Sequence, residues 1–306
     1  MGVIEKVIDL IKITRPLNGF MMGVAAFIGA FVVMGFSIDF QTIIIIFIIG
    51  FTLNGASMIV NDYVDRSIDL INRPDRPLVK GTIKPDEALS LAVILTGIGI
   101  FLSSYLGLVP LIIAVIALIV SLTYNIWGKK MGFVGNLMVA FDTAIPFIFG
   151  GSVAWILTGF ISNSQVYVSI SYIINLYNSI WVTPILLGIL AFLSNVGREI
   201  VKGIADISGD RMVGIKTIAI VYGSRTAGRA ATAFILSAVA LSPLPYVFGL
   251  LGVSYIIVVM FADIIFIYYI IKLLKNLDPK NAYIVKNGLL KAMLLSLIAF
   301  VIGRVI

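Results

Sequence analysis

The chain has 306 residues and lacks two residue types altogether, because it contains no cysteine and no histidine. The absence of cysteine excludes disulfides and thiolate metal sites. The absence of histidine removes the commonest zinc ligand and the usual general base near neutral pH. Catalysis in such a chain must use carboxylates, lysine, arginine, tyrosine, amides or a hard cation.

Charge is also scarce, since only 12% of the residues are charged while 60% are hydrophobic. The mean hydropathy is +1.11, and a soluble domain carries about 25% charged residues. The composition therefore indicates an integral membrane protein. A membrane-spanning helix needs about 20 mostly apolar residues. The sequence predicts an all-α membrane protein in which nine transmembrane helices form a single bundle around a central cavity, as one domain over residues 1–306.

The predicted spans cover residues 17–36, 41–60, 87–106, 109–127, 133–157, 180–198, 227–250, 253–274 and 286–305. An eight- or ten-span arrangement remains an alternative, because residues 166–180 are apolar but interrupted by polar residues. We expect that segment to lie at the outer interface. The start of the chain, MGVIEKVIDLIKITRP, predicts an interfacial amphipathic helix.

The basic residues give an orientation. Of the 22 lysines and arginines, all except Arg304 fall at the N-terminus or in alternate loops between the predicted spans. The positive-inside rule places the N-terminus and these loops in the cytoplasm. The net charge of +7 thus reflects loop positions and does not predict nucleic-acid binding. We expect a multi-pass protein of the cell membrane with its acidic sites on the cytoplasmic side and no obligate protein partner.

Two acidic clusters lie at the cytoplasmic ends of spans. In IVNDYVDRSIDLINRPDRPLVKG (59–81), helical rotation brings Asp62, Asp65 and Asp69 within roughly 60° of one another. Asn61 lies beside them, and Asn54 continues this face into the membrane. In GREIVKGIADISGD (197–210), the polar residues Glu199, Lys202, Asp206 and Asp210 share a face of roughly 80°.

Like charges at this spacing repel and weaken a helix, so each face needs a cation. A lone pair of aspartates is more often a solvated helix end. Two such faces on one side of the membrane, however, predict charges that point into a shared cavity. Oxygen ligands without histidine or cysteine suit Mg²⁺, which typically shares one or two carboxylates with a substrate phosphate. The pattern predicts a phosphate or diphosphate ligand bridged by Mg²⁺.

These stretches resemble a known family. NDYVDRSID (61–69) with NRPDRPL (72–78) is similar to the first aspartate-rich motif of the UbiA superfamily of intramembrane prenyltransferases, and REIVKGIADISGD (198–210) with GIKT (214–217) is similar to the second. TYN (123–125) and GNLMVA (135–140) match a further stretch. The resemblance implies that a polyprenyl diphosphate binds through Mg²⁺ between the two motifs, that its allylic C–O bond ionises, and that an acceptor captures the carbocation.

The resemblance also implies roles for individual residues. The expected metal-site residues are Asn61, Asp62, Asp65, Asp69, Asp206 and Asp210, and the four aspartates at 65, 69, 206 and 210 are expected to be catalytic. The expected substrate-binding residues are Asn54, Asn61, Arg66, Arg73, Arg76, Lys129, Lys130 and Lys202. Tyr124 is expected near the allylic carbon, although an aromatic residue at a membrane interface is the plainer interpretation. Gly203 stands where the family commonly has aspartate.

The acceptor is the least determined part of the expectation. The run DRSIDLINRPDRPL resembles the branch that transfers geranylgeranyl to the hydroxyl of geranylgeranylglyceryl phosphate in archaeal ether-lipid synthesis. An acceptor with its own phosphate would use further basic residues, for which Lys80, Lys130, Arg211 and Lys216 are candidates. A quinone-type aromatic acceptor such as 4-hydroxybenzoate is an alternative, and a secondary transporter is a remote one.

Three acids have less certain roles. Glu199 or a diphosphate oxygen could accept the hydroxyl proton. Asp142 and Asp263 lie within predicted spans, where acids are costly and functional by default, but the sequence assigns them no role.

Overall fold

The computed structural model describes residues 3–162, 170–212 and 214–305, and these ranges contain helices and no strand. Nine helices in them are long and apolar enough to cross a membrane, which confirms the predicted spans. They are α2 (Pro16–Met34), α3 (Phe40–Val64), α6 (Pro85–Leu106), α7 (Leu108–Ile126), α8 (Phe133–Ser162), α9 (Ile170–Ala205), α11 (Ile218–Leu241), α13 (Val253–Lys275) and α14 (Pro279–Val305).

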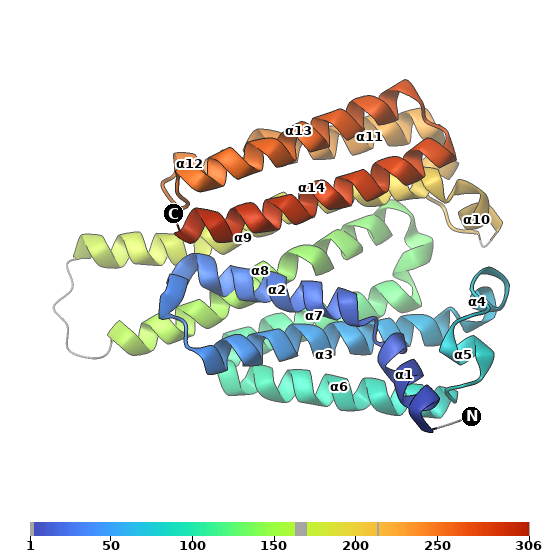
Figure 1. The fold of residues 1–306 in the computed structure, drawn as a ribbon, viewed down its shortest axis with the longest axis horizontal. Coiled ribbons are helices and arrows are strands. Elements are labelled where there is room, and N and C mark those ends of the chain that lie inside the picture. The colour runs from blue at the N-terminus through green and yellow to red at the C-terminus, as the bar shows by residue number, and fades with distance from the viewer. Residues whose placement is uncertain (1–2, 163–169, 213, 306) are drawn as a thin grey trace.

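Short helices gather at one end of the bundle (Figure 1). They are α1 (Val3–Ile13), α4 (Arg66–Asn72), α5 (Pro77–Lys80) and α10 (Ile207–Met212). The opposite end carries α12 (Leu244–Val247) and the C-terminus, as an odd number of crossings requires. Helix α1 exposes the apolar side chains of Ile4, Val7, Ile8 and Ile11, which suits the interfacial position expected for it.

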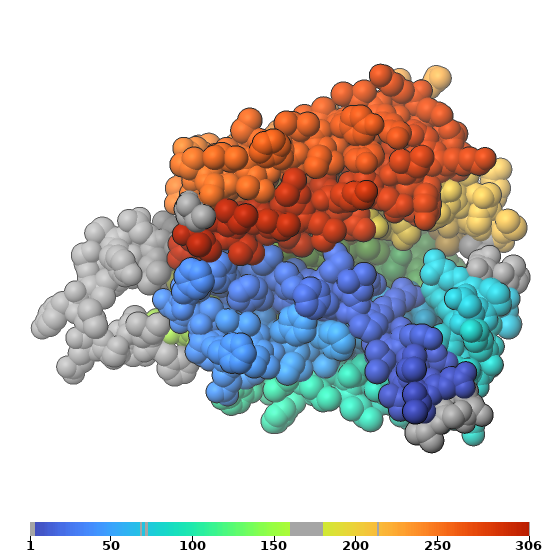
Figure 2. All heavy atoms as spheres, viewed as in Figure 1, coloured from blue at the N-terminus to red at the C-terminus, as the bar shows by residue number. Residues whose placement is uncertain are grey.

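Helices α8 and α9 pack against each other at the centre and are the most buried of the nine. Helix α2 packs against α3 and α8, while α9 also packs against α11 and α14. In Figure 1, the C-terminal helices α11, α13 and α14 lie on one side of this centre, and α3, α6 and α7 lie on the other. Helix α14 lies directly against α2 on the face seen in Figure 2.

The structure describes residues 170–180 of the segment expected at the outer interface as the first part of a longer helix, and the position of this segment relative to the membrane stays a prediction. From Ile170 onward the chain is helical and runs without interruption into the sixth span as α9. The start of the expected segment, residues 166–169, lies outside the described residues. A helix of 36 residues is about 54 Å long, well beyond the hydrocarbon thickness of roughly 30 Å, so α9 is long enough to extend beyond the hydrocarbon region.

The contact between α2 and α8 depends on small residues. A Cβ added at Gly150 of α8 would lie 2.0 Å from the carbonyl oxygen of Ala26, and one added at Gly29 of α2 would lie 2.1 Å from the carbonyl oxygen of Phe147. Apolar helices gain no hydrophobic energy by associating in lipid, so close backbone approach through small residues holds them together. This crossing fixes α2, and with it the start of α2 at the polar end, against α8.

We expect Gly150→Val to force α2 and α8 apart and to destabilise the protein by about 1–3 kcal/mol or more. The measurement is the thermal unfolding midpoint of the detergent-solubilised protein. Gly97→Val is the matched control, because an added Cβ at Gly97 would meet nothing within 4 Å. Equal midpoints for the two variants would contradict the importance of this crossing.

Candidate active site

Both acidic motifs contain a helix break, and in both the break falls at an aspartate. Helix α3 ends at Val64 and α4 begins at Arg66, with Asp65 between them at φ −81° and ψ 0°. Backbone hydrogen bonds nevertheless continue in helical register, from Asp65 N–H to the Asn61 carbonyl (3.0 Å) and from Asp69 N–H to the Asp65 carbonyl (2.8 Å). The expected shared face of the three carboxylates therefore survives the break.

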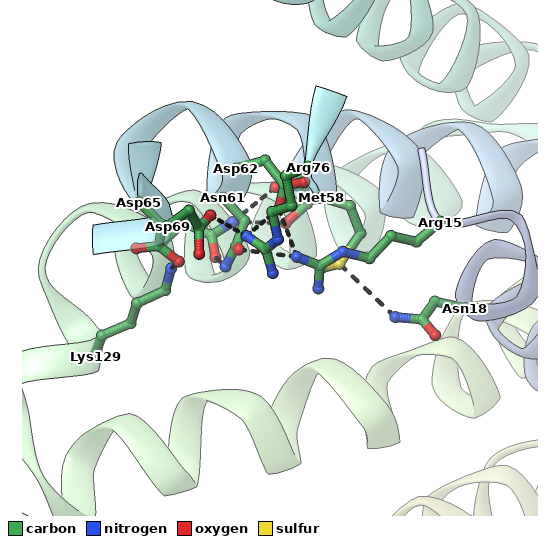
Figure 3. Close-up of polar contacts among 11 residues, drawn as sticks. Arg15, Asn18, Met58, Asn61, Asp62, Asp65, Asp69, Arg76 and Lys129 are labelled. Carbon is green, nitrogen blue, oxygen red and sulfur yellow. Dashed lines mark hydrogen bonds and ion pairs between the residues drawn. The ribbon is translucent and has the colours of Figure 1, made fainter. Parts of the chain in front are cut away.

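Cations from three other segments meet the carboxylates of the first motif (Figure 3). Arg76 donates to both Asp62 (2.9 Å) and Asp69, and it thereby joins two like charges. Lys129, from the short 3₁₀ helix that follows α7 (Gly128–Met131), bonds Asp65 at 2.6 Å. Burial raises the pKa of Asp69, whereas the neighbouring Arg76 acts in the opposite direction. Burial also lowers the pKa of Lys129, against the effect of Asp65.

Arg15 is the contact that the sequence analysis missed. Its guanidinium donates to Asp62 at 2.5 Å and to Asn61 at 3.3 Å. Arg15 precedes Pro16 and adopts the left-handed conformation with φ 50°, the one positive φ among the described non-glycine residues. This conformation costs about 1–2 kcal/mol. The sequence alone gives Arg15 only a place among the basic residues that set the orientation.

Asn61 extends the motif into the bundle through a line of polar side chains. Its amide donates to Asn125 of α7 (3.0 Å), and Asn125 donates to the hydroxyl of Ser57 (2.9 Å). Ser57 in turn bonds Ser121 at 2.5 Å. Buried polar groups need such partners, so this line joins α3 to α7 at a defined register. The line includes Asn125 of the TYN stretch (123–125), to which the sequence analysis assigned no role.

The second motif has the same construction. Asp206 separates α9 from α10, and hydrogen bonds from Asp206 N–H to the Lys202 carbonyl and from Asp210 N–H to the Asp206 carbonyl (both 2.9 Å) preserve the register. Lys286 of α14 lies 3.7 Å from Asp206. Burial and the adjacent Asp206 raise the pKa of Asp210 to about 6.

Glu199 is buried beneath this face. It accepts hydrogen bonds from Arg198 and Lys202, both at 3.0 Å, and it is not among the residues that line the cavity described below. Gly203, where the resemblance led us to look for aspartate, faces Thr217, because an added Cβ would lie 3.3 Å from the Thr217 Cβ. A carboxylate there would displace the start of α11.

Tyr124 lies within range of charges from both motifs, those of Asp65, Lys202 and Asp210. The motifs also share one end of the bundle (Figure 1). Across the described ranges, however, no three acidic side chains converge closely enough to hold a metal ion. The residues fit Mg²⁺ in the chemistry of their donors, which are all carboxylate or amide oxygens. The arginines and Lys129 hold the first-motif oxygens in this structure.

A cavity of about 460 Å³ opens beside the motifs. Its polar mouth is lined by Arg15, Asn61, Tyr124, Arg198 and Lys202, and its deeper wall is mostly apolar, with Ile49, Leu53, Leu118, Ile145 and Phe149. Asn54 lines the same cavity, as expected of a residue on the face that continues inward from Asn61. The cavity combines a cationic entrance with an apolar interior, and both are features of a site for an amphipathic anion.

Several of the cations expected to bind substrate do not line the cavity. Arg66, Arg73 and Lys130 are exposed and do not line the cavity. The same holds for the residues suggested for an acceptor phosphate, Lys80, Arg211 and Lys216. Each of these residues lies near a motif in sequence, but its side chain is exposed and does not enter the cavity. The spacing in one sequence does not show which way such a side chain points. Arg15 and Arg198, which were not among the expected substrate-binding residues, line the cavity.

Comparison with known proteins agrees with this arrangement. Residues 22–298 match the model of the UbiA prenyltransferase family. The chain belongs to the UbiA prenyltransferase family. It is therefore a prenyltransferase of the membrane, and the secondary-transporter alternative is wrong.

Within the UbiA family, relatives at about one-third identity span the whole chain. The chain is 33% identical over 293 residues to the digeranylgeranylglyceryl phosphate synthase of Methanothermobacter thermautotrophicus, covering 96% of this chain and 95% of the relative. It is 32% identical to the synthase of the same name from Methanocaldococcus jannaschii, covering 100% and 99%.

Solved structures share the fold. A structure of digeranylgeranylglyceryl phosphate synthase, 31% identical, superposes with a TM-score of 0.80 over 98% of this chain and 99% of that one. A UbiA homolog from Archaeoglobus fulgidus bound to GPP and Mg²⁺, 16% identical, superposes with a TM-score of 0.63 over 94% of this chain and 99% of that one.

We expect Mg²⁺ binding to weaken as the pH falls through about 6. The pKa of Asp210 is raised to about 6, so below that pH a proton occupies the carboxylate and competes with the metal. Calorimetric titration with Mg²⁺ between pH 7.5 and 5.5 tests this.

Asp210→Asn removes the competing group, and the variant should bind Mg²⁺ more weakly at pH 7.5 with a flatter dependence on pH. Asp86→Asn is the control, because Asp86 is exposed at the start of α6. An unchanged pH dependence in the Asp210 variant would contradict the assignment.

Proposed function

We propose that the protein transfers a geranylgeranyl group from geranylgeranyl diphosphate to the hydroxyl of geranylgeranylglyceryl phosphate, with Mg²⁺, in archaeal ether-lipid synthesis. The observation that carries the proposal is the cavity with a cationic mouth and an apolar interior. Both substrates of this reaction have an anionic head and a long isoprenoid tail, and one amphipathic cavity suits each of them.

Cations stand at two places, the mouth of the cavity and the adjacent first motif. Arg15, Arg198 and Lys202 all line it, while Arg76 and Lys129 stand at the adjacent first motif. Arginine suits phosphate because its planar fork donates two parallel hydrogen bonds. A carboxylic aromatic acceptor would need fewer cations. Two phosphorylated substrates would account for cations at the mouth and at the first motif. The relatives of similar length that are named digeranylgeranylglyceryl phosphate synthase support geranylgeranylglyceryl phosphate as the acceptor.

The residues that would hold Mg²⁺ are Asn61, Asp62, Asp65, Asp69, Asp206 and Asp210. When bound, the metal neutralises charge that develops on the leaving diphosphate. The structure solved with GPP and Mg²⁺ belongs to a homolog with this fold. Because the chain has no cysteine and no histidine, the two motifs offer carboxylate and amide oxygens, which favour hard cations.

The cationic side chains around the proposed Mg²⁺ site would bind the diphosphate by charge and hydrogen bonding. Lys129 and Arg76 lie against the carboxylates of the first motif, and Lys202 lines the mouth. Fixed cations directed at an oxygen that gains charge stabilise the transition state more than the ground state. Tyr124 lines the mouth of the cavity and lies within range of charges from both motifs, which supports a position near the allylic carbon.

The sidedness follows from the basic residues. The end of the bundle that carries α4, α5 and α10 (Figure 1) also carries the loops richest in lysine and arginine. By the positive-inside rule this end faces the cytoplasm, and the diphosphate would enter the cavity from that side.

The detergent-solubilised enzyme should form ether product from geranylgeranyl diphosphate and geranylgeranylglyceryl phosphate, and EDTA should abolish the reaction. Asp65→Asn should lower the rate by at least about 100-fold, because each charged ligand or donor at a developing anion contributes on this scale. The measurement is diphosphate release together with mass spectrometry of the lipid product.

Asp86→Asn makes the same change from carboxylate to amide at an exposed residue at the same end of the bundle, and it should leave the rate unchanged. Product formed only with 4-hydroxybenzoate would reject the lipid acceptor and establish the aromatic alternative. Full activity in EDTA would reject the metal.

A further inference from the structure

Three buried polar side-chain atoms in the described part of the chain have no hydrogen-bond partner: Asn54 Nδ2, Asp142 Oδ1 and Arg198 Nε. All three residues line the same 460 Å³ cavity. A buried polar group without a partner destabilises the folded protein, and such groups are rare in native proteins. Their convergence on one cavity indicates that a ligand supplies the missing bonds.

The three atoms differ in what they require. Asn54 Nδ2 and Arg198 Nε are donors, whereas the Asp142 carboxylate oxygen is an acceptor. Arg198 lies at the level of the second motif, where anionic groups are expected. Asn54 and Asp142 line the same cavity and offer it one donor and one acceptor, so a ligand group that meets both must be able to accept and to donate. A hydroxyl is the simplest such group.

The depth of this pair follows from the line of polar side chains. Ser121 faces the Asp142 carboxylate, and Ser121 also bonds Ser57. Ser57 lies four residues before Asn61 on α3, and Ser121 lies four before Asn125 on α7. Each step is about one helical turn, or 5.4 Å. Asp142 therefore lies about one turn deeper than Asn61, where the first carbon of a prenyl chain would lie if its diphosphate is held at the first motif.

We propose that Asp142 is the catalytic residue that receives the proton of the acceptor hydroxyl, and that Asn54 orients that hydroxyl by donating to its oxygen. This inference rests on the proposed function. In the step, the acceptor oxygen forms a bond to C1 of geranylgeranyl diphosphate while the bond from C1 to the diphosphate oxygen breaks. The electron pair leaves with the diphosphate, and the hydroxyl proton moves to Asp142 Oδ1.

The two other candidates fit this role less well. Glu199 is held by Arg198 and Lys202 and lies outside the cavity lining. Asp263, the other acid in a span, accepts a hydrogen bond from Ser242 at 2.6 Å and lines a smaller neighbouring cavity of about 100 Å³. Asp142 alone among these three acids has an unpartnered oxygen in the larger cavity.

The test compares wild type with Asp142→Asn and Asp263→Asn, using full-length protein, Mg²⁺, geranylgeranyl diphosphate and geranylgeranylglyceryl phosphate. General-base catalysis contributes about 10²–10⁴-fold, so Asp142→Asn should lower kcat by at least about 100-fold. Its affinity for an unreactive thio analogue of geranylgeranyl diphosphate should stay within about twofold of wild type. Asp263→Asn should retain the wild-type kcat.

The pH profile separates catalysis from a structural role. The acid limb of the wild-type profile for kcat should be absent in Asp142→Asn, and formate should restore part of the rate of Asp142→Gly. Wild-type kcat in Asp142→Asn, or loss of analogue binding as large as the loss of rate, would overturn the proposal. If wild type itself makes no ether product, the proposed function fails and takes this inference with it.

Asn54→Ala provides a second variant in case Asp142 substitutions do not fold. Loss of one orienting hydrogen bond should raise KM for the lipid acceptor by about fivefold to tenfold and leave KM for geranylgeranyl diphosphate unchanged. An unchanged KM for the acceptor would reject the hydroxyl site.

Discussion

The pairing of buried carboxylates with cations at one end of the bundle is the interaction on which the rest of the site depends. Asp62 and Asp69 are each only 5% exposed, and an unpaired buried charge costs several kcal/mol. Arg76 bonds both of them, so the loop between α5 and the end of α4 is tied to α3. Arg15 and Lys129 extend the pairing to the start of α2 and the end of α7. One electrostatic requirement thereby draws four segments together around the mouth of the cavity.

The helical core makes that pairing geometrically possible. Helices α8 and α9 occupy the centre, and α2 approaches α8 closely enough that their backbones touch at Gly29 and Gly150. This contact places the α2 N-terminus beside the end of α3, where Arg15 meets Asp62. The left-handed conformation of Arg15 is the local cost of that placement.

Polar groups inside the bundle are arranged by depth. Charged residues stand at the mouth, an amide and hydroxyl line follows one turn below, and apolar side chains complete the interior. This gradient matches a substrate whose anionic head stays at the mouth while its tail enters the apolar wall. The two groups of polar residues differ in their partners. The acids of the first motif form ion pairs with cations of the same chain, whereas Asn54 and Asp142 keep atoms without a hydrogen-bond partner. The first group neutralises itself, and the second is open to a ligand.

The sequence by itself determined the nine spans, the two acidic faces and the family, because apolar run length and the 3.6-residue period are local properties. Tertiary structure decided which cations meet the acids. Arg66 and Arg73 lie closest in sequence to the first motif yet are exposed, whereas Arg15 reaches Asp62 from 47 residues away. The break at Asp65 and the crossing of α2 over α8 set those directions. Asp142 was visible as a costly residue in a span, but only packing showed that its oxygen lacks a partner, since hydrogen-bond satisfaction depends on neighbours from other helices.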